Sequence, residues 1–361
     1  MSCSDPLVTS LEPLRHLRNI RRLTLGYQVE SCEELGAVSA LDLEPLRGLF
    51  HLKSLDLNHT SVRDLSALSG LFRLESLNLA ATKITHIGAI THLSNLRYLV
   101  LRETPVQNLA GLEQLRKLTT LDVSRTTITD IDALADLQYL EDLDASSTRI
   151  VDIQSLARIT SLVKLNLENT SVADLSPIQH STSLESVNIG RTKIDSLSLL
   201  SGLSALTTLN ASQLGIVTIS PLSGLFELRE LDFSVTKVRD LNPLKALSKL
   251  RSLRAFGTQI AGIDAIEYMK DLVLLDISYT RVVDVTPLSS TPKIRTLRVS
   301  GLVLNDIEPI YQLTQLRSLQ VRDFKRSAIL SLKRQKPDVS IGTHELRAID
   351  KRFIRCLFAI P

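Results

Sequence analysis

A 22-residue repeat constrains the fold of this chain more than any other feature of its sequence. The unit is clearest at residues 228–250, LRELDFSVTKVRDLNPLKALSKL, where Thr236 separates two groups of apolar residues. Shifting this frame by 22 residues reproduces it in twelve units, residues 52–315, without an insertion or deletion. The frame places threonine at Thr60, Thr82, Thr104, Thr126, Thr148, Thr170, Thr192, Thr236, Thr258 and Thr280, and leucine at Leu214 and Leu302. The chain is therefore a tandem array of one structural unit.

Each unit is expected to form one short strand followed by one compact return. The apolar residues that open a unit, such as Leu228, Leu231 and Phe233, alternate as in a strand, and the later spacing of three is typical of tight helical turns. The apolar side chains of one unit do not offset the backbone entropy of its 22 residues, so a single unit cannot fold alone. Stacking would bury these side chains in one continuous parallel sheet. The expected core includes Leu165, Leu209, Leu231 and Leu275.

The pattern LxxLxLxxTxVxDLxPLxxLxxL resembles the leucine-rich-repeat superfamily. It is most similar to the 22-residue repeats of internalins and of the leucine-rich-repeat regulatory subunit of protein phosphatase 1. The resemblance implies an α/β solenoid with a curved parallel sheet on the concave face and short helical or 3-10 returns on the convex face. It implies an interaction scaffold and no single chemistry. Threonine stands where the family usually has asparagine, and its hydroxyl predicts a structural hydrogen-bonding ladder.

The array divides the chain into four segments. Residues 1–51 are divergent repeats with an inserted loop at about 29–37, which is either functional or a shield for the open edge of the sheet. Residues 52–315 are the twelve regular repeats, and residues 316–341 form a closing unit of one helix and a last strand. Residues 342–361 are predicted to form a basic amphipathic helix, which folds back on the closing unit or enters a groove of a partner.

Aspartate and proline recur in the returns. Asp174, Asp240 and Asp284 each stand three residues before a proline. A carboxylate at such a place accepts hydrogen bonds from free backbone N–H groups, and proline has no N–H to satisfy. These aspartates are therefore interpreted as structural residues and not as catalytic carboxylates.

The sequence contains no pattern typical of an enzyme. It lacks a glycine-rich phosphate loop, a nucleophile elbow, a CxxC motif and any metal-ligand spacing among its seven histidines. We therefore predict a non-catalytic protein with no cofactor, metal or small-molecule substrate. No signal-like segment or long apolar run is present, so neither secretion nor a membrane span is expected. Three widely separated cysteines, Cys3, Cys32 and Cys356, favour a reducing, cytoplasmic location.

Outward side chains of the strands are the candidate partner-binding residues, because they all face the concave surface. The column four residues before the threonine is mostly Asp or Asn, which is typical of a structural ladder, so departures from it are more informative. Aromatic and arginine side chains flanked by acids have the composition of interface anchors. One group is Tyr98, Arg102, Glu103, Asp122, Arg125, Asp142, Asp144, Lys164 and Glu168, and the other is Arg254, Phe256, Asp276, Tyr279 and Arg298.

Two functions compete. The first is a protein-binding scaffold or adaptor that holds a protein partner on the concave face. The alternative is a structural subunit of a ribonucleoprotein or cytoskeletal assembly, because residues 291–361 carry fourteen Lys and Arg against six Asp and Glu, a net charge of +8. The candidate contacts to RNA or an acidic surface are Lys333, Arg334, Lys336, Lys351 and Arg352. A solvated cap and scattered surface residues would explain the same features without any partner.

Overall fold

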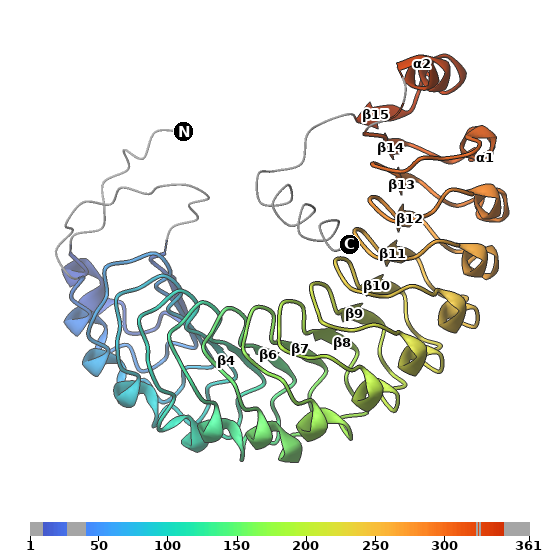
Figure 1. Ribbon diagram of the computed structural model, residues 1–361. Coiled ribbons are helices and arrows are strands. Elements are labelled where there is room, and N and C mark those ends of the chain that lie inside the picture. The colour runs from blue at the N-terminus through green and yellow to red at the C-terminus, as the bar shows by residue number, and fades with distance from the viewer. Residues whose placement is uncertain (1–9, 27–40, 323, 325, 343–361) are drawn as a thin grey trace. The chain divides into compact units, whose positions relative to one another are not determined.

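The computed structural model describes residues 10–26, 41–322, 324 and 326–342. The chain forms two compact units, residues 1–183 and 184–361, here called the N-terminal unit and the C-terminal unit. In each unit the strands line the inner, concave side and the short helical turns line the outer side (Figure 1). The expected leucine-rich-repeat solenoid is confirmed. The inserted loop at about 29–37 and residues 343–361 of the tail lie outside the described residues.

All strands are three residues long and pair in parallel with their sequence neighbours. The N-terminal unit contains β1 (Arg22–Thr24), β2 (Ser54–Asp56), β3 (Ser76–Asn78), β4 (Tyr98–Val100), β5 (Thr120–Asp122), β6 (Asp142–Asp144) and β7 (Lys164–Asn166). The C-terminal unit contains β8 (Ser186–Asn188), β9 (Thr208–Asn210), β10 (Glu230–Asp232), β11 (Ser252–Arg254), β12 (Leu274–Asp276), β13 (Thr296–Arg298), β14 (Ser318–Gln320) and β15 (Ser340–Gly342).

The register repeats from strand to strand because the units are equal in length. Leu231 pairs with Leu253, and every regular pair is likewise 22 residues apart. Arg22 pairs with Ser54, and their separation in the sequence is ten residues longer than one repeat. The inserted residues therefore lie outside the ladder and leave its register intact. Side chains at the same position of successive repeats therefore form rows across the sheet.

The returns are 3-10 turns in nearly every repeat. Those of the N-terminal unit are η1 (Glu12–His16), η2 (Glu44–Leu46), η3 (Ser66–Leu68), η4 (Gly88–Ile90), η5 (Leu112–Gln114), η6 (Asp132–Leu134), η7 (Gln154–Arg158) and η8 (Ser176–Ile178). Those of the C-terminal unit are η9 (Ser198–Leu200), η10 (Ser220–Leu222), η11 (Asn242–Leu244), η12 (Asp264–Tyr268) and η13 (Thr286–Ser290), followed by α1 (Glu308–Tyr311) and α2 (Arg326–Gln335).

The recurrent aspartates shape the entry to these turns. The Asp174 carboxylate accepts a hydrogen bond from the backbone N–H of Ser176 at 2.8 Å, and Asp284 accepts one from Thr286 at 2.8 Å. Hydroxyl groups of the same two residues also donate to these carboxylates, and these bonds hold the pKa of both aspartates below the ordinary value. This is the chemistry of an Asx turn. The structural interpretation of these aspartates is confirmed.

The core and the threonine column differ in how well the sequence predicted them. Leu165, Leu209, Leu231 and Leu275 are at most 2% exposed, as expected. The threonine hydroxyls, however, do not form a ladder between repeats. Thr236 Oγ1 donates to the carbonyl of Phe233 in its own repeat at 2.8 Å, and the other described threonines of the column do the same. The prediction of a threonine ladder is wrong, because each hydroxyl bonds the carbonyl three residues earlier in its own repeat.

The residue before each threonine adopts a left-handed conformation, which sequence analysis missed. Its N–H donates to the next repeat, as from Val235 to the carbonyl of Phe256 at 2.7 Å, so the ladder at this turn is made by the backbone. The φ angle at Val235 is 60°, in a region that is strained for a β-branched residue. Asn169, Gly257 and Gly301 occupy the same place with residue types that tolerate it. These residue types were the sequence signal for a left-handed conformation at this position.

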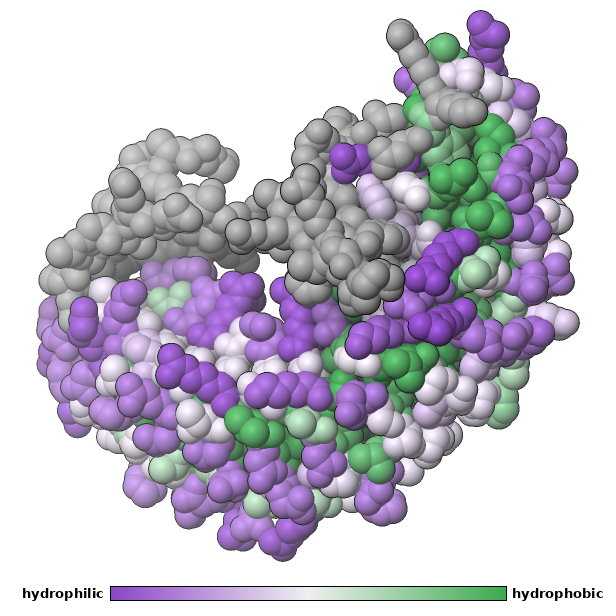
Figure 2. Space-filling view, viewed as in Figure 1, coloured by the Kyte–Doolittle hydropathy of each residue, from purple (hydrophilic) through white to green (hydrophobic). Residues whose placement is uncertain are grey.

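The closing segment carries the last regular elements of the described chain. Strand β15 pairs with β14, and Leu332 of α2 is fully buried. Figure 2 shows hydrophilic residues over most of the visible surface of both units, with hydrophobic residues along one side of the C-terminal unit. Among the described helices, none has the length and apolar character needed to cross a membrane.

Candidate partner-binding surface

Most residues of the column four before the threonine support the turn that follows their strand. The Asp122 carboxylate accepts a hydrogen bond from the N–H of Ser124 at 2.9 Å, and Asp232 accepts one from Ser234 at 2.8 Å. The same bond is made by Asp56, Asn78, Asp144, Asn166, Asn188, Asn210 and Asp276. The column is structural, as expected, but most of its bonds are local Asx bonds, and cross-strand contacts join Asn166 to Asp144 and Arg298 to Asp276.

Between β2 and β14 four strands depart from this rule, at Val100, Arg254, Arg298 and Gln320. In two of them a serine of the preceding repeat supports the turn instead. The N–H of Ser300 donates to Ser278 Oγ at 3.1 Å, and the N–H of Arg322 donates to Ser300 Oγ at 3.0 Å. The Arg298 side chain is therefore not needed for its own turn.

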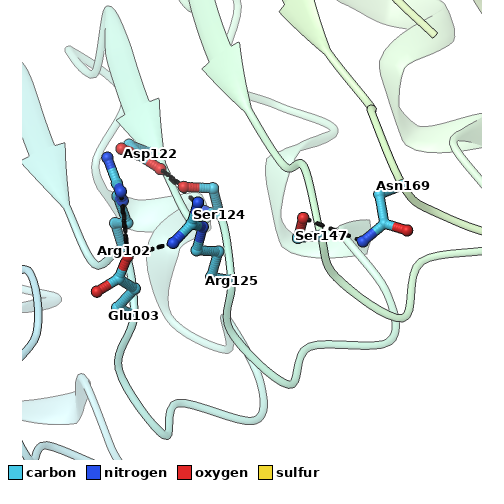
Figure 3. A network of polar contacts seen from close by, with 7 residues as sticks. All are labelled: Arg102, Glu103, Asp122, Ser124, Arg125, Ser147 and Asn169. Carbon is cyan, nitrogen blue, oxygen red and sulfur yellow. Dashed lines mark hydrogen bonds and ion pairs between the residues drawn. The ribbon is translucent and has the colours of Figure 1, made fainter. Parts of the chain in front are cut away.

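In the N-terminal unit, Arg102, Glu103 and Arg125 form a charged cluster, here called the glutamate network. One carboxylate oxygen of Glu103 accepts from Arg102 Nη2 at 3.0 Å and from Arg125 Nη1 at 2.9 Å (Figure 3). Burial raises the pKa of the Glu103 carboxyl, but the hydrogen bonds and charges of the two arginines outweigh it and leave the pKa below the ordinary value. The predicted group of residues does come together here, and its charges are satisfied internally.

The acidic residues beside the glutamate network lie on β5 and β6. Burial raises the pKa of Asp122 and of Asp142, and the nearby charge of Asp144 raises both further. Lys164 lies 3.8 Å from the Asp142 carboxylate, and its positive charge partly offsets the rise in the pKa of Asp142. Tyr98 on β4 is 50% exposed. The first predicted group is thus a mixed surface of paired charges with one exposed aromatic ring.

The C-terminal unit has a hollow of about 470 Å³ on its concave side. It crosses the ends of seven successive strands, from Gln213 after β9 to Gly342 in β15. All five predicted residues of the second group line it: Arg254, Phe256, Asp276, Tyr279 and Arg298. Val235 and Arg322 also contribute, which the sequence did not indicate. We call this feature the arginine hollow.

Two arginines of the hollow differ in their contacts. Arg298 Nη1 lies 3.4 Å from the carboxylate of Asp276, which is 6% exposed and also accepts from the N–H of Ser278 at 3.1 Å. Burial raises the pKa of Asp276 above the ordinary value. Arg254 pairs in register between Asp232 and Asp276, yet within the described chain its guanidinium forms no hydrogen bond or ion pair. Arg254 is thus the arginine of the hollow whose guanidinium has no polar partner among the described residues.

Two predicted anchors are less exposed than expected. The rings of Phe256 and Tyr279 meet edge to face with centroids 5.5 Å apart. Tyr279 is only 9% exposed, and a Cβ at Gly301 would lie 2.5 Å from its ring. The expectation of an exposed Tyr279 is wrong, because its ring packs against Gly301 in the turn of the next repeat. Phe256 is half-buried and keeps part of its surface in the hollow.

The basic residues proposed to contact RNA or an acidic surface lie in different environments. Lys333 and Arg334 are exposed on α2. Lys336 Nζ instead donates to the carbonyl of Leu313 at 2.9 Å, so it contributes to packing of the closing segment. Lys351 and Arg352 lie outside the described residues. In the part of the chain that is described, no three His, Cys, Asp or Glu side chains gather as metal ligands would.

Comparisons with known proteins agree with this architecture. No family model and no curated protein matches the chain. Among solved structures, an internalin (inlF) from Listeria monocytogenes is 26% identical with a TM-score of 0.78, covering 87% of this chain and 89% of that one. A leucine-rich-repeat protein of Leptospira interrogans is 18% identical with a TM-score of 0.69, covering 92% and 98%.

A receptor ectodomain is a more distant neighbour. The leucine-rich-repeat ectodomain of the receptor kinase GASSHO1/SCHENGEN3 from Arabidopsis thaliana, solved in complex with Casparian strip integrity factor 2, is 16% identical with a TM-score of 0.69. The match covers 92% of this chain and 42% of that one. This neighbour and the Leptospira protein show the fold alone. Together with the internalin match and the repeats themselves, they identify the chain as a leucine-rich-repeat protein with internalin-like repeats.

Proposed function

We propose that this chain is a non-catalytic scaffold that binds a protein partner on the concave side of its sheet. The observation that carries the proposal is the arginine hollow, where the turn-supporting residue is replaced by arginine and a hollow of about 470 Å³ is left beside Phe256. Arginine and aromatic side chains in a concave site are typical of interface anchors. The receptor ectodomain among the structural neighbours was solved with a bound factor, which supports binding as the common use of this fold.

A capture experiment with matched variants tests the proposal. The full chain, Tyr98→Ala, Phe256→Ala and the control Phe226→Ala would each be used to capture proteins from extracts of the source cells, with quantitative mass spectrometry. Phe226 is 57% exposed and lies between η10 and β10, outside the hollow. Binding of a genuine partner should be weakened roughly 5- to 30-fold by one of the two concave variants, since large anchors contribute ~1–2 kcal/mol each. The control variant should bind the partner as well as the wild type does.

The competing function predicts a different result from the same experiment. An RNA-binding subunit would retain RNA at physiological salt, would lose it when Lys333 and Arg334 are changed to glutamine, and would release it steeply with added salt. That outcome, with every captured protein insensitive to Tyr98→Ala and Phe256→Ala, would overturn the scaffold proposal.

A reducing, cytoplasmic location belongs to the same proposal. It is supported by three cysteines that are far apart in the sequence, Cys3, Cys32 and Cys356. When cells are quenched with acid and the denatured protein is then alkylated near neutral pH, all three thiols should be labelled. A protein with two of them blocked as a disulfide would point to an oxidising compartment.

A further inference from the structure

We propose that the arginine hollow binds an extended segment of a protein partner and takes one internal Asp or Glu side chain of that segment at Arg254 and Arg298. The inference rests on the proposed scaffold function and adds the chemistry of what is bound. It follows from the length of the hollow, from its charge and from the free guanidinium within it.

The length of the hollow fits a single extended segment. Its lining runs from Gln213, which follows β9, to Gly342 in β15. Parallel strands lie ~4.8 Å apart, so this row of seven strands spans about 29 Å, the length of about nine residues of extended chain. Arg254 and Arg298 belong to β11 and β13, in the interior of the row. A segment lying along the hollow therefore meets both arginines with an internal residue and not with its end.

The charge of the lining fits one carboxylate. The lining residues Arg254, Arg298 and Arg322, set against Asp232 and Asp276, give a formal net charge of +1; because Arg298 contacts Asp276 and Arg322 has a contact of its own, this excess is assigned to Arg254. A single Asp or Glu side chain neutralises this excess. A nucleic-acid strand would bring several phosphates into the same length and would require more cations than the lining provides.

Neither arginine is saturated by the protein. Arg254 has no polar partner in the described chain, although Asp232 and Asp276 flank it in register. A guanidinium carries five N–H donors, and Asp276 engages Arg298 only through Nη1 at 3.4 Å. Arg298 Nε has no acceptor among the described residues. Because Arg298 Nε is buried, a ligand would meet the terminal N–H groups of Arg298 and the guanidinium of Arg254. Both groups can donate hydrogen bonds to a further carboxylate, which arginine binds well because of its planar fork of donors.

The apolar part of the lining predicts the neighbouring residue of the segment. Phe256 stands two residues after Arg254 on the same repeat, where six of the other repeats have serine, and its ring is held by Tyr279. Because the Phe256 ring is held in place, it offers a surface of fixed orientation beside the arginine. We expect an aromatic or aliphatic residue one or two positions from the acidic residue of the bound segment.

A peptide library tests the inference on the full chain. A displayed library of random 12-residue peptides would be selected in parallel on the wild-type chain, on Arg254→Gln and on Arg281→Gln. Arg281 is an exposed arginine of the same unit that does not line the hollow. The wild type and Arg281→Gln should enrich peptides with an acidic residue beside an apolar one, and Arg254→Gln should not. Arg254→Lys should retain part of the binding.

A double-mutant cycle then isolates the charge pair. The best peptide would be synthesised with an amidated C-terminus, with and without replacement of its acidic residue by the corresponding amide. This replacement should weaken binding at least 10-fold on the wild type and less than 3-fold on Arg254→Gln, because the two groups form one interaction. Thermal unfolding of Arg254→Gln should match the wild type, since Arg254 has no polar partner among the described residues.

Several outcomes would overturn the inference. They are enrichment of peptides without an acidic residue, equal binding to Arg254→Gln, loss of binding on amidation of the peptide terminus, and no enrichment at all. If any of these occurred while captured partners remained sensitive to Phe256→Ala or Tyr98→Ala, the scaffold function would stand and only the acidic-segment inference would fail. If captured partners were also insensitive to both variants, the proposed function itself would fail.

Discussion

In the N-terminal unit the charged side chains of the concave side pair with one another, whereas in the C-terminal unit Arg254 has no partner among the described residues. Glu103 joins Arg102 and Arg125, and Lys164 approaches Asp142, all on one backbone pattern of strand and left-handed turn. The C-terminal unit uses the same pattern but replaces the turn-supporting residue by Arg254 and Arg298. Identical backbones thus carry a self-satisfied surface in one unit and an unsatisfied one in the other.

This difference has a physical reason. A turn-supporting Asp or Asn has its side chain occupied by a backbone N–H, so it has less capacity left for a partner. Where Ser278 and Ser300 take over that support, the strand residues Arg298 and Gln320 are not needed for their own turns, and both line the hollow. Unoccupied donors beside a hollow, and not charge alone, distinguish a binding surface from a structural one.

The largest expected effect tests whether the two units are independent. Leu231→Asp and Leu143→Asp place a charge in the core of the C-terminal and the N-terminal unit, since both leucines are at most 1% exposed. Each should cost at least about 4 kcal/mol, because the charge has no buried partner. Hydrogen exchange should show lost protection around β9–β11 for the first variant and around β5–β7 for the second. Loss of protection throughout the chain in both variants would show one cooperative unit, and unchanged exchange would show that the register is wrong.

The next effect compares the two arginines of the hollow. Arg298→Gln removes the charged partner of buried Asp276 and should reduce the free energy of unfolding by about 1–3 kcal/mol. Arg254→Gln should change it by less than about 0.5 kcal/mol, as for surface substitutions without contacts. Denaturant unfolding monitored by circular dichroism measures both. Equal destabilisation by the two variants would mean that Arg254 has a structural role.

A stabilising variant tests the strain at the turn. Val235→Asn should raise stability by about 1 kcal/mol, because asparagine tolerates a φ of 60° and valine does not. Asn169, which already occupies this position in the N-terminal unit, is the natural reference, and Asn169→Val should lower stability by a similar amount. A Val235→Asn chain that melts at a lower temperature would show that the Val235 side chain contributes more by packing than it costs in strain.

The smallest expected effects are on the pH dependence of stability, where Glu103 and Asp122 in the N-terminal unit act in opposite directions. The pKa of Glu103 is lowered from 4.5, so its stabilisation is present above that pH and is lost as the pH falls through the folded pKa. The pKa of Asp122 is raised from 3.8, so its charged form destabilises at neutral pH and this penalty is relieved as the pH falls through the folded pKa. Glu103→Gln should therefore lose, and Asp122→Asn gain, a few tenths of a kcal/mol at pH 7.

Melting temperatures of these two variants and the wild type between pH 3 and pH 8 measure the effect. The Asp122→Asn difference should disappear at the acid end of this range, and the Glu103→Gln difference should shrink as the pH falls through the lowered pKa of Glu103. Asp122→Asn keeps its turn, since Asn78 and Asn166 make the same bond at the same position. A loss of stability in Asp122→Asn at pH 7 would show that its charge is favourable, contrary to the raised pKa.

The sequence predicted what depends on period and could not predict what depends on contacts. The 22-residue spacing predicted the parallel sheet, the short turns and the burial of Leu231, because these follow from backbone geometry alone. It also brought the residues of each candidate group together. The Thr236 ladder was wrong, since whether a hydroxyl bonds within or between repeats depends on the direction of one side-chain torsion. The burial of Tyr279 was missed because Gly301, one repeat away, leaves the space that its ring fills.

The strict register of the strands has a consequence for how such a surface can vary. Each outward residue is defined by its repeat and by its position within that repeat. Each can therefore be substituted without moving the others. An exchange at Arg254 leaves the leucine layer untouched, because the neighbouring column that holds Leu253 points the other way. The concave surface can therefore change one residue at a time while the leucine layer that holds the fold together stays the same.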